Sequence, residues 1–343
     1  MPLSNFVASE CTSARAKIIS YSPPLLTAAG VITVITTIIG VIGNSLTIIA
    51  LLRNSKMRTV AAAFIASLCI SDFLICIIVL PFGAHQFFVG TWTHGRFLCT
   101  LIPMLRYGSV GVSLLSIATI SINRYILIAW PNLYPKVFTK LKVSLYIGII
   151  WAFSYGLQIP TIFGVWGVFG FDEKLGTCSI CKDKNGRSAK TALFIIGFVL
   201  PAIIIVVSYS KIYWVVRTSH KRLNKHGSTL NTKRSDMRIT KMFLVIFLCF
   251  TVCYLPLTIA KVFDPNLKSP PLLIVAYILL YLAACLNPVI YVTMNKQYRQ
   301  AYFDTVKCRV GSSYDSSSPV QQNSKSIMSV VFLKNVVSPN PKV

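Results

Sequence analysis

The chain has 343 residues, of which 54% are hydrophobic and only 13% are charged. A soluble protein covers its surface with roughly 25% charged residues, so this composition excludes a soluble enzyme and a disordered chain. The formal net charge is +25, from 34 Lys and Arg against 9 Asp and Glu. The basic residues stand between long uncharged runs, which favours a membrane protein over a nucleic-acid-binding protein.

Seven apolar runs follow one another along the chain, each with at most two charged residues. An α-helix needs about 20 residues to cross about 30 Å of hydrocarbon, and every run meets this length. None of the runs alternates as the strands of a membrane β-barrel would. We therefore expect an all-α membrane protein, a seven-transmembrane helix bundle. The runs are Leu25–Leu52, Val60–Gly83, Phe97–Ile128, Val143–Phe171, Thr191–Ser210, Met242–Ala260 and Ser269–Asn295.

The charges between the runs predict the orientation of the bundle. Basic residues gather after the first, third and fifth runs, and the positive-inside rule makes those connectors cytoplasmic. The resulting organisation is an extracellular N-terminal tail over 1–24, the helix bundle over 25–308 and a polar cytoplasmic tail, expected to be disordered, over 309–343. Aromatic and basic residues over Asn295–Lys307 predict a short amphipathic helix 8 on the membrane surface.

Ten cysteines are present, and five of them lie inside the runs, where apolar packing accounts for them. Four others fall on the predicted outer side, an oxidising compartment: Cys11, Cys99, Cys178 and Cys181. Four cysteines allow three pairings, which these residues alone leave open. Cys308 follows the last run among basic residues and is a palmitoylation candidate.

Few ionisable side chains lie inside the runs, and each is costly enough to be a functional candidate. They are Asp72, Arg106 and Arg124. The four histidines lie at loops and Asp72 stands alone, so we expect no catalytic residues, no metal site and no enzyme. Asn44 and Asn287 add amides to the first and last runs, and prolines interrupt five runs. These prolines are Pro81, Pro160, Pro201, Pro256 and Pro288.

Arg106 and Arg124 are eighteen residues apart, which is five helical turns, so they share one helix face. If Arg124 faces the cytoplasmic crevice, Arg106 faces an outer cavity. A guanidinium there suits a carboxylate or phosphate of a ligand. Two alternatives stay open: Arg106 pairs with an acid such as Asp264, or it reaches the membrane interface.

Short motifs in a fixed order accompany the seven runs. They are Gly43-Asn44, Leu68-x-x-x-Asp72, Asn123-Arg124-Tyr125, Trp151, Pro201 with Tyr209, Phe250, Cys253-Tyr254-Leu255-Pro256 and Asn287-Pro288-Val289-Ile290-Tyr291. This set resembles the rhodopsin-like (class A) G-protein-coupled receptors from Leu25 to about Cys308. The stretches Arg124–Pro131 and Pro135–Phe138 resemble the insect Moody and Trapped-in-endoderm receptors. Phe247–Phe250 and Met294–Tyr302 are similar to the medium-chain-fatty-acid receptor of mammalian leukocytes.

The resemblance implies a receptor in the plasma membrane that relays an extracellular, anionic or lipid-like ligand to heterotrimeric G proteins by outward movement of helix 6. It implies no cofactor, a sodium ion near Asp72, and arrestin and receptor kinases as further partners, with membrane lipids around the bundle and no nucleic acid. The alternative is a seven-helix protein with an adhesion or lipid-handling role and no G-protein coupling. Intact Arg124 and Tyr291 argue against that alternative.

The resemblance also implies residue roles. Coupling and activation would fall to Asn123, Arg124, Tyr125, Asp236, Tyr209, Asn287, Pro288 and Tyr291, with transmission by Phe250, Pro201 and Pro256. Ligand contacts would be Arg106, Lys182 and Tyr254, and the sodium pocket Asn44, Asp72 and Ser113. The implied disulfides are Cys99–Cys178 and Cys11–Cys181.

Three positions depart from the family pattern. Asn123 replaces an aspartate, so we expect Asp236 to hold Arg124 in the inactive state with Asn123 assisting; a solvated helix cap is the alternative role for Asp236. Tyr254 replaces a tryptophan beneath the ligand cavity. Ala283 replaces a polar residue of the sodium pocket, which weakens the expectation of sodium.

Overall fold

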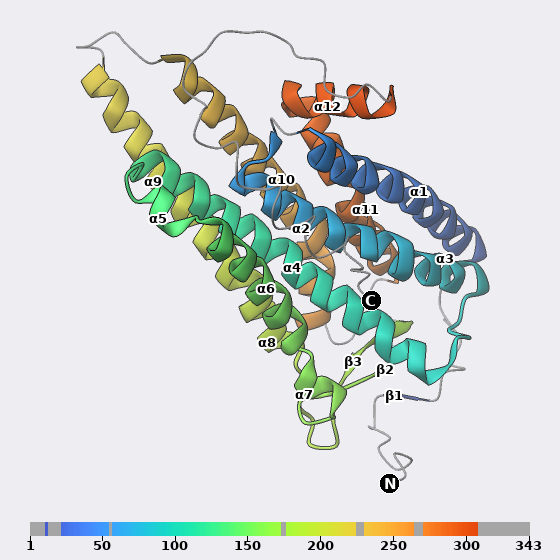
Figure 1. The fold of residues 1–343 in the computed structure, drawn as a ribbon. Coiled ribbons are helices and arrows are strands. Elements are labelled where there is room, and N and C mark those ends of the chain that lie inside the picture. The colour runs from blue at the N-terminus through green and yellow to red at the C-terminus, as the bar shows by residue number, and fades with distance from the viewer. Residues whose placement is uncertain are drawn as a thin grey trace, which may run out of the picture.

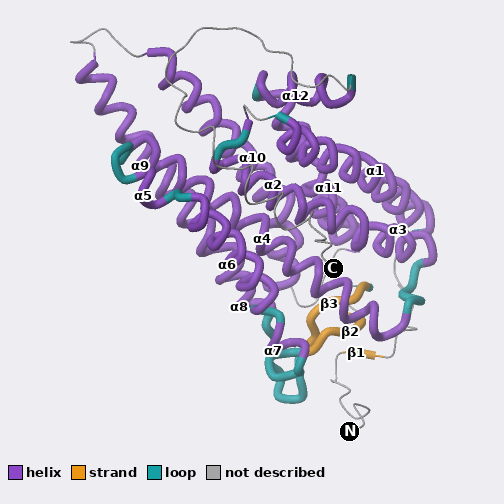
Figure 2. The backbone as a smooth tube through the Cα atoms, viewed as in Figure 1, coloured by secondary structure: helices purple, strands orange, loops and turns teal. Residues whose placement is uncertain are grey.

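The computed structural model describes residues 11–12, 22–54, 57–172, 176–223, 230–263 and 270–307, with side chains described in these ranges except at 11–12, 219–237 and 260–270. Helices dominate, and two π-helical turns (η2 and η3) and a small sheet interrupt them (Figures 1 and 2). The elements are β1 (Cys11–Thr12), α1 (Pro23–Arg53), α2 (Val60–Leu74), η2 (Ile75–Val79), α3 (Leu80–Val89), α4 (Gly95–Ala129), α5 (Tyr134–Val137), α6 (Lys140–Gly156), α7 (Ile159–Ile162), β2 (Val168–Asp172), β3 (Thr177–Cys181), α8 (Lys190–Phe194), η3 (Ile195–Val199), α9 (Leu200–Leu223), α10 (Leu230–Phe263), α11 (Pro270–Met294) and α12 (Lys296–Val306).

Seven helical segments in the described part of the chain are long and apolar enough to cross a membrane, which confirms the predicted bundle. Two of them are composite: α2, η2 and α3 form the second segment, and α8, η3 and α9 form the fifth. Large apolar side chains also cover the outer surface, where Val252 is 65% exposed. An apolar outer face of this extent is typical of helices that contact lipid.

The third membrane-spanning segment, α4, lies at the centre of the bundle. It packs against α2, α6 and α9, while α11 packs between α1 and α10. Figure 1 shows the β2–β3 hairpin at one end of the bundle and α12 across the other end. We call these the hairpin end and the α12 end. The buried side chains of all seven segments form one continuous apolar core.

Two prolines stand two residues after the end of a π-helical turn. Pro81 comes after η2 and Pro201 after η3. Proline has no N–H and its ring clashes with the carbonyl four residues earlier, so a wider turn just before it accommodates both defects. Both helices then continue across the bundle without ending.

The predicted fourth run was wrong at its end. Val143–Phe171 was expected to be one helix, but α6 ends at Gly156, α7 ends at Ile162, and β2 begins at Val168. Pro160, Gly164 and Gly167 explain the break, because both glycines adopt positive φ angles of 70° and 79°. The chain then pairs β2 antiparallel with β3, and β1 with the other edge of β2.

The short helix α12 confirms the predicted helix 8. Asn295 caps it by accepting a hydrogen bond from the backbone N–H of Gln297 at 2.9 Å. One face is buried against the bundle, where the hydroxyl of Tyr302 shares a hydrogen bond with Thr47 of α1. The opposite face exposes apolar side chains, with Val306 68% exposed. This division fits a helix that lies at a membrane surface.

Candidate functional site

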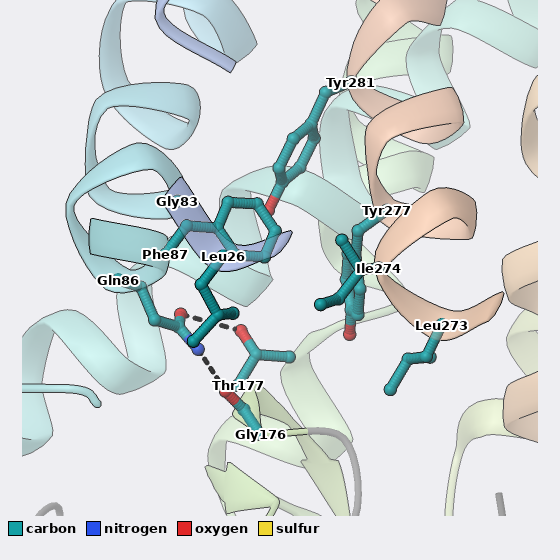
Figure 3. A pocket seen from close by; sticks show the side chains of 10 residues that line it. All are labelled: Leu26, Gly83, Gln86, Phe87, Gly176, Thr177, Leu273, Ile274, Tyr277 and Tyr281. Atoms are coloured by element: carbon teal, nitrogen blue, oxygen red, sulfur yellow. Dashed lines mark hydrogen bonds between the residues drawn. The ribbon is translucent and has the colours of Figure 1, made fainter. Parts of the chain in front are cut away.

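The β2–β3 hairpin is fastened over one end of the bundle at several points. The Cys99–Cys178 disulfide implied by the resemblance is present and joins β3 to the start of α4. Gln86 of α3 donates to the carbonyl of Gly176, and Thr177 donates back to the Gln86 side chain at 3.0 Å (Figure 3). The hairpin therefore covers the space between the helices at this end.

Further contacts tie the hairpin to the fifth segment and to α4. Lys190 of α8 pairs with Asp172 of β2 at 3.0 Å. Tyr107 of α4 shares a hydrogen bond of 3.1 Å with Ser179 of β3. Cys181 at the end of β3 is also disulfide-bonded. Its partner lies outside the side chains that the structure describes, so the Cys11–Cys181 bond stays a prediction.

Arg106 lies beneath the hairpin and is only 4% exposed. Its Nη2 donates to the backbone carbonyl of Cys178 at 2.9 Å, and its guanidinium lies over the rings of Tyr107 and Tyr277 at 5.6 and 5.8 Å. Its Nε is buried without a hydrogen-bond partner. Among the described carboxylates, none forms an ion pair with Arg106. The guanidinium thus keeps hydrogen-bonding capacity for an anion.

A cavity of about 810 Å³ begins at Arg106 and extends between α4, α6, η3 and α10. Lys190 and Tyr254 also line it, whereas Lys182 is exposed beyond β3 and is not among the lining residues. Of the three predicted ligand contacts, the structure therefore brings Arg106 and Tyr254 together.

A second cavity of about 340 Å³ lies on the other side of Tyr277, between α1, α3, α11 and the hairpin. Figure 3 shows Tyr277 and Tyr281 of α11 on one wall and Phe87 of α3 on another. Its polar groups at the hairpin, Gln86 and Thr177, bond to each other. It carries fewer groups for a charged ligand than the larger cavity.

Stacked aromatic rings lead from the larger cavity toward the middle of the bundle. Phe250 stacks on Tyr254 at 5.0 Å, and Tyr254 lies 6.4 Å from the ring of Phe198, with both pairs 13° from parallel. Phe198 in turn stacks on Phe194 at 5.6 Å. Tyr254 therefore joins the cavity wall to Phe250, as a transmission role requires, with Pro256 half a turn further along α10.

Asp72 lies at the centre of a buried polar cluster. Its Oδ2 accepts from the amide of Asn287 at 2.7 Å, and its Oδ1 accepts from the hydroxyl of Ser113 at 3.1 Å. Asn44 lies apart from this pair of bonds, donating to the carbonyls of Gly40 and Ala284 at 2.9 Å each. Its Oδ1 is buried without a partner among the described atoms.

Arg124 and Asn123 lie at the α12 end of α4 and are both buried. The Arg124 guanidinium lies 6.0 Å from the ring of Phe243 of α10. Tyr209 of α9 donates to the backbone carbonyl of Thr240 of α10 at 3.0 Å. Since α10 is held against its neighbours here, the structure is closed at this end. The side chain of Asp236, and Cys308, lie outside the described residues.

The remaining predicted switch residues adjoin this closed end. Tyr291 is fully buried and stacks on Tyr298 of α12 at 5.2 Å. Tyr125 accepts a hydrogen bond from the indole of Trp130 at 3.4 Å. Pro288 packs where α1 passes α11, because Gly43 carries no Cβ: one placed there would lie 3.0 Å from the proline ring.

Sequence reasoning missed several residues of the cavity, because it considered ionisable groups first. Ser154 and Gln158 of the fourth segment line the cavity, as do Lys190 and Phe198. The available signal was the pair Ser154 and Gln158, four residues apart in a run without charges. Two polar side chains on one face of such a helix indicate a surface whose polar groups need hydrogen-bond partners from the protein or from a bound molecule.

A helix bundle with a disulfide-bonded hairpin over a cavity at one end and a buried arginine at the other is the architecture of a seven-transmembrane receptor. Residues 43–291 match the model of the family described as 7 transmembrane receptor (rhodopsin family). The chain belongs to this family. Squid rhodopsin has the same fold, with a TM-score of 0.75 over 88% of this chain and 94% of that one at 24% identity.

Named proteins that are similar to this chain support the family assignment. The chain is 44% identical to the G-protein coupled receptor moody of Drosophila melanogaster over 84% of its own length and 52% of that protein. It is 41% identical to Protein trapped in endoderm-1 of the same organism, over 77% of the chain and 74% of that protein. Human melatonin receptor type 1B is 28% identical over 84% and 81%. The chain spans about half the length of the moody receptor.

Proposed function

We propose that the protein is a plasma-membrane receptor that couples an extracellular anionic ligand to heterotrimeric G proteins. The hairpin end faces the exterior and the α12 end faces the cytoplasm, as the basic connectors require. One helix, α4, carries two buried arginines, and this observation carries the proposal. Arg106 lies under the hairpin with an Nε that has no partner among the described atoms, and Arg124 lies at the other end, where Tyr209 holds α10.

Ligand binding acts by favouring one of two conformations. A molecule that binds the open state better shifts the bundle toward it by its difference in affinity. The stacked rings of Tyr254 and Phe250 connect the cavity to α10, so a ligand that displaces Tyr254 pushes on the helix that closes the cytoplasmic end. Release of Tyr209 from Thr240 then frees α10 to move outward.

The proposal includes further partners at the α12 end and an ion inside the bundle. Arrestin and receptor kinases would bind the opened α12 end. A sodium ion would be held by the Asp72 carboxylate and the Ser113 hydroxyl, since a buried carboxylate requires a compensating charge or hydrogen bonds. Ala283 offers no oxygen there, so any site has fewer ligands than the family pattern.

The test is G-protein activation in cells that express the full chain, with and without a panel of anionic lipids. Arg124→Ala should abolish basal and ligand-evoked signals, and Arg106→Gln should abolish only the response to anions. Arg96→Ala is the matched control, because Arg96 lies on the same helix end but is exposed. Normal signalling by Arg124→Ala at equal surface expression would favour the non-coupling adhesion or lipid-handling role.

A further inference from the structure

Three side chains that line the larger cavity carry buried polar atoms that have no hydrogen-bond partner in the described part of the chain. They are Arg106 Nε, Ser154 Oγ and Gln158 Oε1. The three residues are 4%, 2% and 2% exposed. Buried polar atoms are almost always paired, and leaving one unpaired is costly. Three around one cavity indicate groups that a bound molecule satisfies.

The two groups on α6 and its C-terminal end are held in place by their neighbours. Gln158 Nε2 donates to the backbone carbonyl of Ser154 at 3.5 Å, which uses the amide nitrogen and leaves the amide oxygen without a partner among the described atoms. Ser154 faces Gly111 of α4, where a Cβ would lie 3.0 Å from the serine oxygen. Glycine at this position therefore leaves the hydroxyl room beside the cavity.

The rise of the helices gives the distance of each of the three groups from the hairpin end. Gln158 lies one turn, about 6 Å, from Ser154 toward the hairpin end. Arg106 lies five residues, about 7.5 Å, from Gly111 in the same direction, and Gly111 touches Ser154. Arg106 and Gln158 thus lie at similar depth on facing helices, and Ser154 lies deeper.

Most of the remaining lining is apolar, and part of it reaches the outer surface of the bundle. Phe153 lines the cavity and is 44% exposed on the lipid-facing side of α6. Leu157 and Leu193 continue this wall between α6 and α8. On the side away from α4, the cavity lies between α6 and the α8–η3 part of the fifth segment.

We propose that this cavity binds an anionic single-chain lipid whose acid is adjacent to an amide, as in an N-acyl amino acid. The acid pairs with Arg106, the amide N–H donates to Gln158 Oε1, and the amide carbonyl accepts from the Ser154 hydroxyl. The acyl chain follows Phe153, Leu157 and Leu193 toward the bilayer. This inference rests on the proposed anion contact at Arg106 and adds the second polar contact.

The experiment compares N-lauroylglycine with its N-methyl analogue, which has the same charge and chain but no amide N–H. Affinities are measured for the purified full chain in lipid nanodiscs, by competition against radiolabelled N-lauroylglycine, at concentrations below micelle formation. The wild type should prefer N-lauroylglycine about 5- to 10-fold, the effect of one buried hydrogen bond. Gln158→Leu should remove this preference, and Ser154→Ala should weaken both probes equally.

The chain path is tested with a matched pair of glycines. A Cβ at Gly197, which lines the cavity, and at Gly148, on α6 outside it, would each meet no atom within 4 Å. Gly197→Phe fills the crevice and should weaken both probes at least 10-fold, whereas Gly148→Phe should leave binding unchanged. Melting temperatures of all variants identify those that fail to fold.

Outcomes separate this inference from the anion contact. If Arg106→Gln leaves affinity unchanged while Gln158→Leu still removes the preference, the polar subsite stands and the anion contact is wrong. Equal binding of both probes to the wild type, insensitive to Gln158→Leu, means that Gln158 and Ser154 bind water only and overturns the inference. Absence of binding by either probe overturns it as well.

Discussion

Asn123 donates its side-chain amide to the hydroxyl of Tyr134 at 3.2 Å, joining the end of α4 to the short helix α5. The amide oxygen of Asn123 is buried without a partner among the described residues. A neutral amide therefore stands beside Arg124 where most of the family has a carboxylate, and charge-assisted bonds are about twice as strong as neutral ones. The closed state of this receptor lacks that charge.

Asn123→Asp should consequently stabilise the closed state and lower basal G-protein activation several-fold. The new carboxylate accepts from Tyr134 and adds a negative charge next to Arg124. Basal activity is measured with a reporter at matched surface expression. Tyr134→Phe serves as a control that removes the hydroxyl without adding charge. A rise in basal activity in Asn123→Asp would show that this position does not stabilise the closed state.

Removal of the Cys99–Cys178 disulfide should destabilise the hairpin end. The bond closes a separation of 79 residues, and loss of a native disulfide costs about 2–5 kcal/mol. Because Arg106 bonds to the carbonyl of Cys178, the double variant Cys99→Ser/Cys178→Ser should also lose anion-evoked responses. Cys249→Ser changes a free cysteine and is the control. Unchanged melting temperature in the double variant would contradict the expectation.

Gly43→Val should disturb the contact of α1 with α11. Its Cβ would lie 3.0 Å from two atoms of Pro288, and overpacking of this kind costs about 1–3 kcal/mol. The thermal stability of the purified protein should fall accordingly. Gly148→Val, where no atom lies within 4 Å, should cost much less. Equal effects of the two substitutions would mean that helix propensity dominates.

If sodium binds at Asp72, sodium chloride should raise the melting temperature above that in choline chloride, and Asp72→Asn should remove the difference. The asparagine keeps a polar side chain beside Asn287 and Ser113 but carries no charge. Ser154→Ala removes a hydroxyl that bonds to none of the described cluster residues and should retain the sodium effect. No sodium effect in the wild type would leave the cluster as a hydrogen-bonded structural element.

The pKa of His94 is lowered by partial burial and by the neighbouring His85. A lowered pKa means that the folded state favours the neutral ring, so this contribution to stability is complete above pH about 6.5 and is lost as the pH falls through the lowered pKa. The 3.0 Å hydrogen bond between the two rings is lost only when both rings are protonated, because both nitrogens then carry a hydrogen. Melting temperatures of His94→Phe should therefore fall less between pH 7 and 5 than those of the wild type.

Much of the fold could be predicted because helix length and apolar content are properties of single segments. The hairpin could not, because Val168–Asp172 is apolar and nearly uncharged like the helix before it. Pro160, Gly164 and Gly167 alone mark the change of structure. The π-helical turns before Pro81 and Pro201 were equally hidden, since a proline in a membrane helix can be absorbed in several ways.

The predicted site residues were those with charge or with a family motif. Arg106 and Tyr254 line the larger cavity and Asp72 lies in a buried polar cluster, and the two charged residues were singled out because a charged side chain inside a membrane is costly. Lys182 and Lys190 were indistinguishable in the sequence, and only the fold of the hairpin brings Lys190 to the cavity. The positions of Ser154 and Gln158 beside the cavity depend on which face of α6 meets Gly111, and this is a tertiary relationship that the sequence does not show.

The fastening of the hairpin has a kinetic consequence. Gln86, Tyr107 and Lys190 hold it from three different helices while the disulfide holds it covalently. Lifting it requires these bonds to break together, so a molecule beneath it has a long residence time against escape through the covered end. A molecule beneath the hairpin would then leave sideways, between the helices, more readily than through the covered end.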